Sequence, residues 1–71
     1  PQLRRRSGSG PLHLNADSPL QLSPLAVAPR LRTLPGGTPL RLLRRWSGSD
    51  GQDWLQVQTL AGEQSRGWIR A

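Results

Sequence analysis

The spacing of proline and glycine is the sequence feature that most restricts what this chain can fold into. Seven prolines and eight glycines are spread along 71 residues, and the longest stretch without either is 52–61. Proline inside a helix removes a backbone donor and clashes with the preceding turn, and glycine lowers helix propensity. Within 52–61, apolar and polar side chains alternate, which is typical of a strand. The sequence therefore predicts a fold without helices.

Short alternating segments predict a series of strands separated by turns. These strand candidates are found at 12–14, 20–22, 30–34, 38–46, 54–59 and 66–70. Turn-forming residues occupy 15–18, 35–37 and 61–63, and 47–53 has no apolar residue and is expected to be a loop. We expect an all-β fold of five to six short strands that closes into a small barrel, because closure removes sheet edges that invite aggregation.

The alternation also predicts which side chains form the core. Eight aliphatic residues are expected to point inward: Leu20, Leu22, Leu34, Leu40, Leu42, Leu55, Val57 and Ile69. Two glycines have a predicted role in the backbone. Gly37 is expected to occupy a turn position with positive φ, and Gly67 to permit a bulge or a close backbone approach.

Residues 1–10 differ in composition from the rest of the chain. They read PQLRRRSGSG, with like charges, Ser and Gly, and are predicted to be a flexible arm preceding a barrel over 11–71. The chain has ten arginines, no lysine and a net charge of +6. Three of the arginines form the run Arg4, Arg5, Arg6. Such an arm attracts polyanions in general and selects none.

The inventory of reactive side chains argues against an enzyme. The chain has no Cys, one His and four acidic residues, which are dispersed along the sequence. No nucleophile, base and orienting group can be assembled from them, and no metal site or cofactor is predicted. No apolar run approaches the roughly 20 residues that cross a membrane as a helix.

The three tryptophans are the only aromatic residues and the leading candidates for ligand contact. Trp54 and Trp68 are expected on the sheet face opposite Leu55 and Ile69, where a pair of indoles would form a platform for a peptide or a sugar. The alternative is that each covers a barrel end as a secondary core, which is favoured for Trp68 and left open for Trp54. Trp46 is expected to be exposed and available for contact.

Charged residues flank the predicted loop at 47–53. Arg44 and Arg45 precede it, and Asp50 and Asp53 lie within it. They are candidates for a charged recognition rim. The alternative is a solvated hairpin whose exposed ion pairs contribute only about 0–1 kcal/mol.

The order of motifs over 12–71 resembles the bacterial SH3 (SH3b) domain family. The resemblance is carried by five segments: LQLSP at 20–24, PRLRTL at 29–34, PGGTPLRLL at 35–43, WLQV at 54–57 and GWI at 67–69. It implies a small SH3-like barrel that recognises peptidoglycan or a cell-wall peptide outside the cytoplasm. The chain departs from the family pattern at Ser23-Pro24-Leu25 and in its polar loop at 47–53.

Three functions follow as hypotheses. The first is a non-enzymatic binding module for peptidoglycan, or for a peptide of the cell wall or of a protein. The second is a small adaptor subunit of a larger protein assembly. The third is a nucleic-acid-binding barrel, because arginine suits bidentate contact with phosphate and small barrels host this activity.

Overall fold

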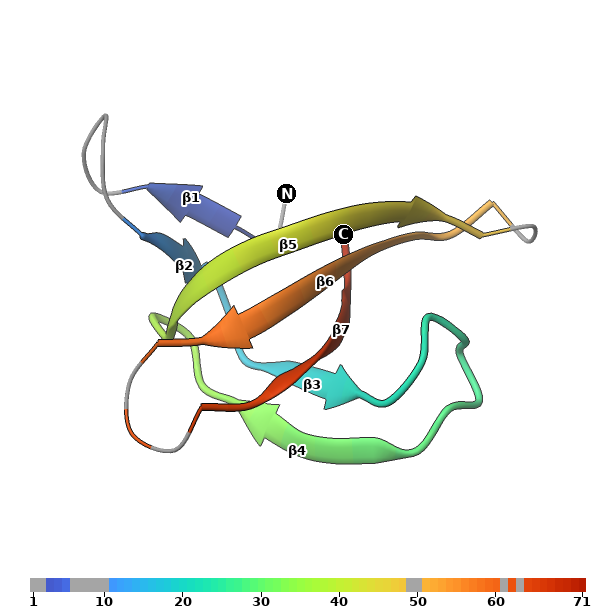
Figure 1. The fold of residues 1–71 in the computed structure, drawn as a ribbon, viewed down its shortest axis with the longest axis horizontal. Helices are drawn as coiled ribbons and strands as arrows, with labels where there is room; N and C mark the ends of the chain where they lie inside the picture. The colour runs from blue at the N-terminus through green and yellow to red at the C-terminus, as the bar shows by residue number, and fades with distance from the viewer. Residues whose placement is uncertain (1–2, 6–10, 49–50, 61, 63) are drawn as a thin grey trace.

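The computed structural model describes residues 3–5, 11–48, 51–60, 62 and 64–71, and these residues contain seven strands and no helix. The strands are β1 (Leu3–Arg5), β2 (Leu12–Leu14), β3 (Ser18–Gln21), β4 (Arg30–Leu34), β5 (Pro39–Ser47), β6 (Asp53–Thr59) and β7 (Arg66–Arg70) (Figure 1). Six of them, β2 to β7, lie in 11–71, as expected.

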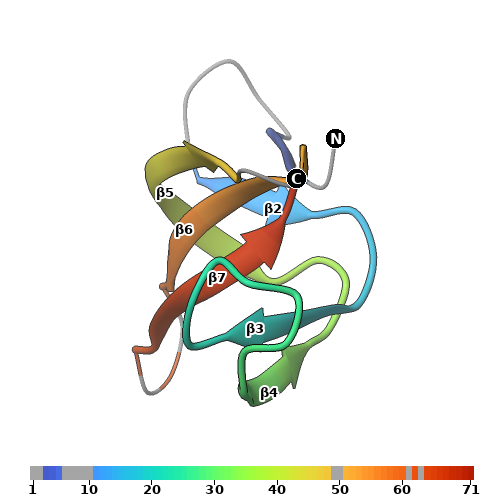
Figure 2. The same cartoon turned by 90° about the vertical axis from the view of Figure 1, so that its right-hand side faces the viewer.

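The described strands form one antiparallel sheet in the order β1-β2-β5-β6-β7-β3-β4. The sheet curls into a half-barrel, and Figure 2 shows how the strands curve around its interior. The all-β architecture of a small SH3-like barrel is therefore confirmed. The expected closure is not reached, because β1 and β4 are the two edges of the sheet.

Hydrogen bonds join the end of β2 and the turn that follows it to the turn before β5. Leu14 N donates to Thr38 O at 3.1 Å, and Gly37 N donates to Leu14 O at 2.8 Å. The carboxylate of Asp17 accepts a bond from Gly36 N at 2.7 Å. Gly37 has a φ of 87°, which confirms the expected positive-φ turn position.

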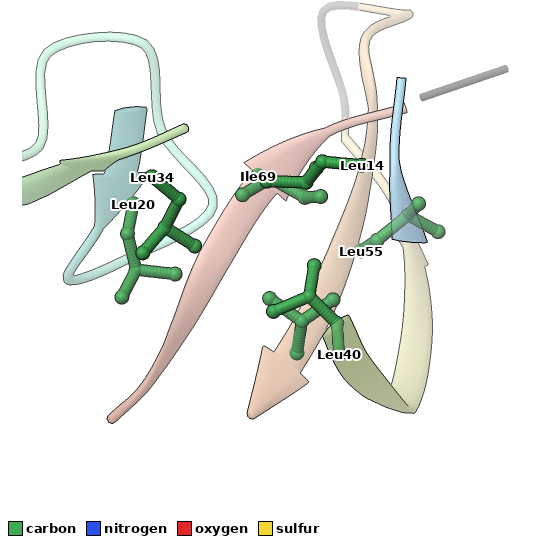
Figure 3. Close-up of a cluster of buried hydrophobic side chains, with 7 residues drawn as sticks. Leu14, Leu20, Leu34, Leu40, Leu55 and Ile69 are labelled. Atoms are coloured by element: carbon green, nitrogen blue, oxygen red, sulfur yellow. The ribbon is translucent and has the colours of Figure 1, made fainter. Parts of the chain in front are cut away.

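The core lies on the concave side of the sheet and is entirely aliphatic. Its buried members are Leu14, Leu20, Leu34, Leu40, Leu55, Val57 and Ile69 (Figure 3). Six of the eight residues expected to point inward are confirmed. Leu14 belongs to the core although the predicted inward set omitted it, and Leu3 packs against the cluster from β1.

Two predicted core residues are wrong. Leu22 is 59% exposed because β3 ends at Gln21 and the chain then turns away from the sheet. Leu42 faces Val57 across β5 and β6, yet it is 38% exposed. β2 pairs with β5 only at Pro39 and Leu40, so among the described strands none but β6 lies beside β5 at Leu42.

Part of the predicted flexible arm is a strand. Leu3 to Arg5 form β1, which pairs with Leu12 to Leu14 of β2. Pairing with β2 and packing of Leu3 against the core hold this segment in place. Arg6 and the remainder of the predicted arm lie outside the described residues.

Candidate functional site

The register of β5, β6 and β7 defines a convex sheet surface, called the outer face below. Leu55, Val57 and Ile69 belong to the core, so the residues that alternate with them point to the opposite side of the sheet. The strand pairings extend this alternation to β5. The outer face consists of nine residues: Arg41, Arg44, Trp46, Trp54, Gln56, Gln58, Arg66, Trp68 and Arg70.

A β-bulge in β5 decides that Trp46 belongs to this face. Leu42 pairs with Val57 and Arg44 pairs with Gln56, so Leu43 is an extra residue in the β5 strand. Strict alternation from Leu40 would have turned residues 44 and 46 toward the concave side. The bulge shifts the phase by one residue, and Trp46 therefore lies directly opposite Trp54.

The three indoles share the outer face but differ in exposure. Trp54 is only 1% exposed, so it is not one of the partly exposed indoles of the predicted platform; it is buried on the outer face, outside the aliphatic cluster. Its ring is flanked by Trp46 on β5 and Arg70 on β7, and the Arg70 Cζ atom lies over it, 5.5 Å from the ring centroid. Trp68 is half-buried, while Trp46 is 50% exposed, as expected.

The charge of the outer face has one sign. Arg41, Arg44, Arg66 and Arg70 are exposed, and none of the nine residues is acidic. Guanidinium groups gathered on one surface produce a positive potential that attracts anions. The glutamines between them add amide donors and acceptors; Gln58 Nε2 donates to Gln64 Oε1 at 3.2 Å.

The predicted charged rim is divided by the sheet. Arg44 pairs with Gln56 on the outer face, whereas Arg45 pairs with Leu55 and so points to the concave side, where it is exposed near the hairpin end. Asp53 pairs with Ser47 and is exposed, and no ion pair joins it to either arginine within the described chain. Asp50 lies outside the described residues. Among the described residues, Arg44 therefore lies on the side of the sheet opposite Arg45 and Asp53.

Few side chains able to bind a metal lie close together in the described part of the chain. No group of three or more His, Cys, Asp or Glu residues gathers there. The carboxylate of Asp17 accepts its bond from Gly36 N in a turn. The same part of the chain contains no helix able to cross a membrane.

A second surface is formed by the loop between β3 and β4. Leu25 is 59% and Val27 is 91% exposed on this loop, which extends beyond the ends of both strands (Figure 1). Gln21 is 4% exposed and supports the loop from below. Its Nε2 lies 3.2 Å from the carbonyl oxygens of Leu25 and Ala28 and 3.5 Å from that of Ala26.

Replacing Gln21 with alanine is expected to free this loop. The loop carbonyls lose their buried donor, and an unsatisfied buried polar group costs about 1–3 kcal/mol. The amides of Leu22 and Ala28, which bond to Pro29 O and Leu25 O, should then exchange with deuterium at least tenfold faster. Gln64→Ala, at an exposed position, is the matched control. Unchanged exchange in Gln21→Ala would show that the amide does not order the loop.

Five outer-face residues were not among the predicted site residues: Arg41, Gln56, Gln58, Arg66 and Arg70. The sequence placed the β6 glutamines on the face of Trp54. It contained no signal for which strands lie beside β6, and so it could not join the arginines of β5 and β7 to that face. Gln21 was also missed. Alternation correctly places it on the side opposite Leu20, facing Trp68, but it gives no sign that the β3–β4 loop covers the side chain there.

Comparison with protein-family models, with curated protein sequences and with solved structures found no match to this chain.

Proposed function

We propose that this chain is a non-enzymatic SH3-like binding module that holds its ligand against the outer face. One observation carries the proposal: all three indoles lie on one surface of the β5-β6-β7 sheet, with Trp46 half exposed and Trp68 half-buried. An accessible indole offers apolar area and one N–H donor. Trp54, buried beneath Arg70, stabilises the surface instead of contacting the ligand.

The SH3b resemblance supports peptidoglycan or a cell-wall peptide as the ligand, and with it a location in the periplasm or cell envelope. The outer face suits such a polymer chemically. Sugar rings stack on exposed indoles, and carboxylates of a peptide accept bidentate hydrogen bonds from arginine. Arg44 and Arg66 are exposed beside the accessible tryptophans for this purpose.

A pull-down on purified peptidoglycan tests this function. The parent chain is expected to co-sediment, and Trp46→Ala to reduce the bound fraction about tenfold, since aromatic anchors dominate such contacts. Leu25→Ala is the control, because Leu25 is similarly exposed but lies on the β3–β4 loop. No sedimentation of the parent, or equal losses in both variants, would reject cell-wall recognition through the outer face.

The adaptor function is the second candidate, and the β3–β4 loop favours it. Leu22, Leu25 and Val27 expose apolar surface on a loop that Gln21 orders. Contiguous exposed apolar surface is typical of protein–protein contacts. Size-exclusion of the native extract distinguishes the two: an assembly far larger than 7.8 kDa that dissociates on Val27→Asp supports the adaptor, and a lone monomer contradicts it.

A further inference from the structure

We infer that the outer face binds single-stranded nucleic acid, through phosphate contacts from its arginines and base stacking on Trp46 and Trp68. This inference rests on the proposed function in one respect, that the outer face is the contact surface. The ligand class is argued from the chemistry of the nine residues alone.

Charge complementarity is the first argument. Four of the ten arginines lie on the outer face, on the strands that flank β6, and none of its nine described residues is acidic. Arg41 and Arg44 lie along β5, while Arg66 and Arg70 lie along β7. Two rows of guanidinium groups on either side of a central strand match a linear chain of phosphates, since arginine recognises phosphate bidentately.

Stacking is the second argument. Trp46 on β5 and Trp68 on β7 are accessible and lie two strands apart, which corresponds to about 10 Å across the sheet. Aromatic side chains on a sheet surface, surrounded by basic residues, bind unpaired bases of any sequence because every base has a π-face. A duplex hides these faces, so the indoles select a single strand.

The central strand supplies the third argument. Gln56 and Gln58 lie between the two rows and are half-buried. Their amides donate and accept hydrogen bonds, and base edges require both. Carboxylates, the anions of an acidic peptide, only accept hydrogen bonds when ionised. The polar edges of bases therefore match both the donors and the acceptors of the glutamine amides, whereas the carboxylates of an acidic peptide match only the donors.

Fluorescence anisotropy with a labelled oligo(dT) of about 12 nucleotides tests the inference on the full chain. The parent should bind oligo(dT) at least tenfold more tightly than a duplex of the same length. Trp46→Ala should weaken binding about tenfold, whereas Leu25→Ala, its control, should not. A duplex bound as tightly as the single strand, or two equal losses, would overturn the inference, because plain charge attraction favours the more highly charged duplex.

Salt dependence tests the arginines separately. Four phosphate contacts predict a slope of log K against log salt of about −3, at roughly −0.7 for each contact on a single strand. Arg44→Gln with Arg66→Gln should reduce the slope by about 1.4. Arg32→Gln with Arg45→Gln removes the same charge from the opposite side of the sheet, because Arg32 pairs with Leu20 and Arg45 with Leu55, and should leave the slope unchanged. Equal changes in the two pairs would place the contact outside the outer face and refute the inference.

The peptidoglycan and oligo(dT) experiments distinguish failure of the proposed function from failure of this inference. Sedimentation with peptidoglycan that depends on Trp46, together with no oligo(dT) binding, would refute this inference and leave the proposed function standing. Oligo(dT) binding that depends on Trp46, without sedimentation, would support the inference and reject the cell-wall ligand. If polyglutamate competes with oligo(dT) as well as unlabelled oligo(dT) does, stacking plays no part and the inference is wrong.

Discussion

Replacing Trp54 with alanine is expected to lower the free energy of unfolding by about 3–5 kcal/mol, the usual cost of truncating a buried aromatic side chain. Trp54 is 1% exposed although it lies on the convex side of the sheet, outside the aliphatic core cluster. It fills the space between Trp46 and Arg70, and the Arg70 guanidinium lies over its ring. A chain of 71 residues has a total stability of only about 4–11 kcal/mol, so this variant should be close to unfolding.

The matched control is Trp46→Ala, one strand away. Trp46 is half exposed, so its removal should cost less than about 1 kcal/mol. Trp54→Phe keeps an aromatic ring beneath Arg70 and should recover part of the lost stability. Urea denaturation followed by circular dichroism measures all three variants without relying on indole fluorescence. Equal midpoints for Trp54→Ala and Trp46→Ala would show that burial at position 54 contributes nothing.

Replacing Gly67 with alanine should destabilise the fold by about 1–3 kcal/mol through overpacking. A Cβ at this position would lie 2.8 Å from Leu20 Cγ and 2.9 Å from Gln21 O. The carbonyl belongs to the β3 backbone, so the clash cannot be relieved by a side chain alone. β3 pairs with β7 only at Gln21 and Trp68, the neighbour of Gly67. The β3–β4 hairpin is therefore expected to loosen from the sheet.

Gly36→Ala is the control for this prediction. Its Cβ would lie 3.2 Å from Ala16 Cα in a turn, a contact that a shift of a few tenths of an ångström relieves. We expect a loss below about 1 kcal/mol there. Hydrogen exchange of the β3 and β4 amides, compared with those of β6, measures the loosening directly. If β3 and β4 keep their protection in Gly67→Ala, the close approach at this glycine does not constrain the sheet.

Gly67 is an example of a residue whose role is only partly predictable from the local sequence. Gly67 was expected to permit either a bulge or a close backbone approach, and the structure selects the close approach, to Leu20 and Gln21. The bulges occur at Leu31 and Leu43, where the pairings shift by one residue. The residues around these two leucines carry no sequence signal for a bulge. The extra residue is set by the register with the partner strand, which is another segment of the chain and cannot be identified from the local pattern.

On the outer face, too, some relations follow from local sequence and others depend on the neighbouring strands. Alternation along β6 placed Trp54 and the two glutamines together, and this relation is confirmed by the register. It could not show that Trp54 is buried, because burial depends on what β5 and β7 bring beside it. Nor could it show that Arg44 and Arg45 point to opposite sides, since the phase of β5 changes at Leu43.

Sequence alone determined the absence of helix from the described residues, the positions of strands β2 to β7 and the inward direction of six core aliphatics. It did so because proline, glycine and period-two alternation act within a few residues. Only the tertiary structure decided the strand order, the two bulges, and the burial of Trp54 and Gln21. Each of these depends on the register between segments distant in the chain, and a shift of one residue there reverses which face a side chain occupies.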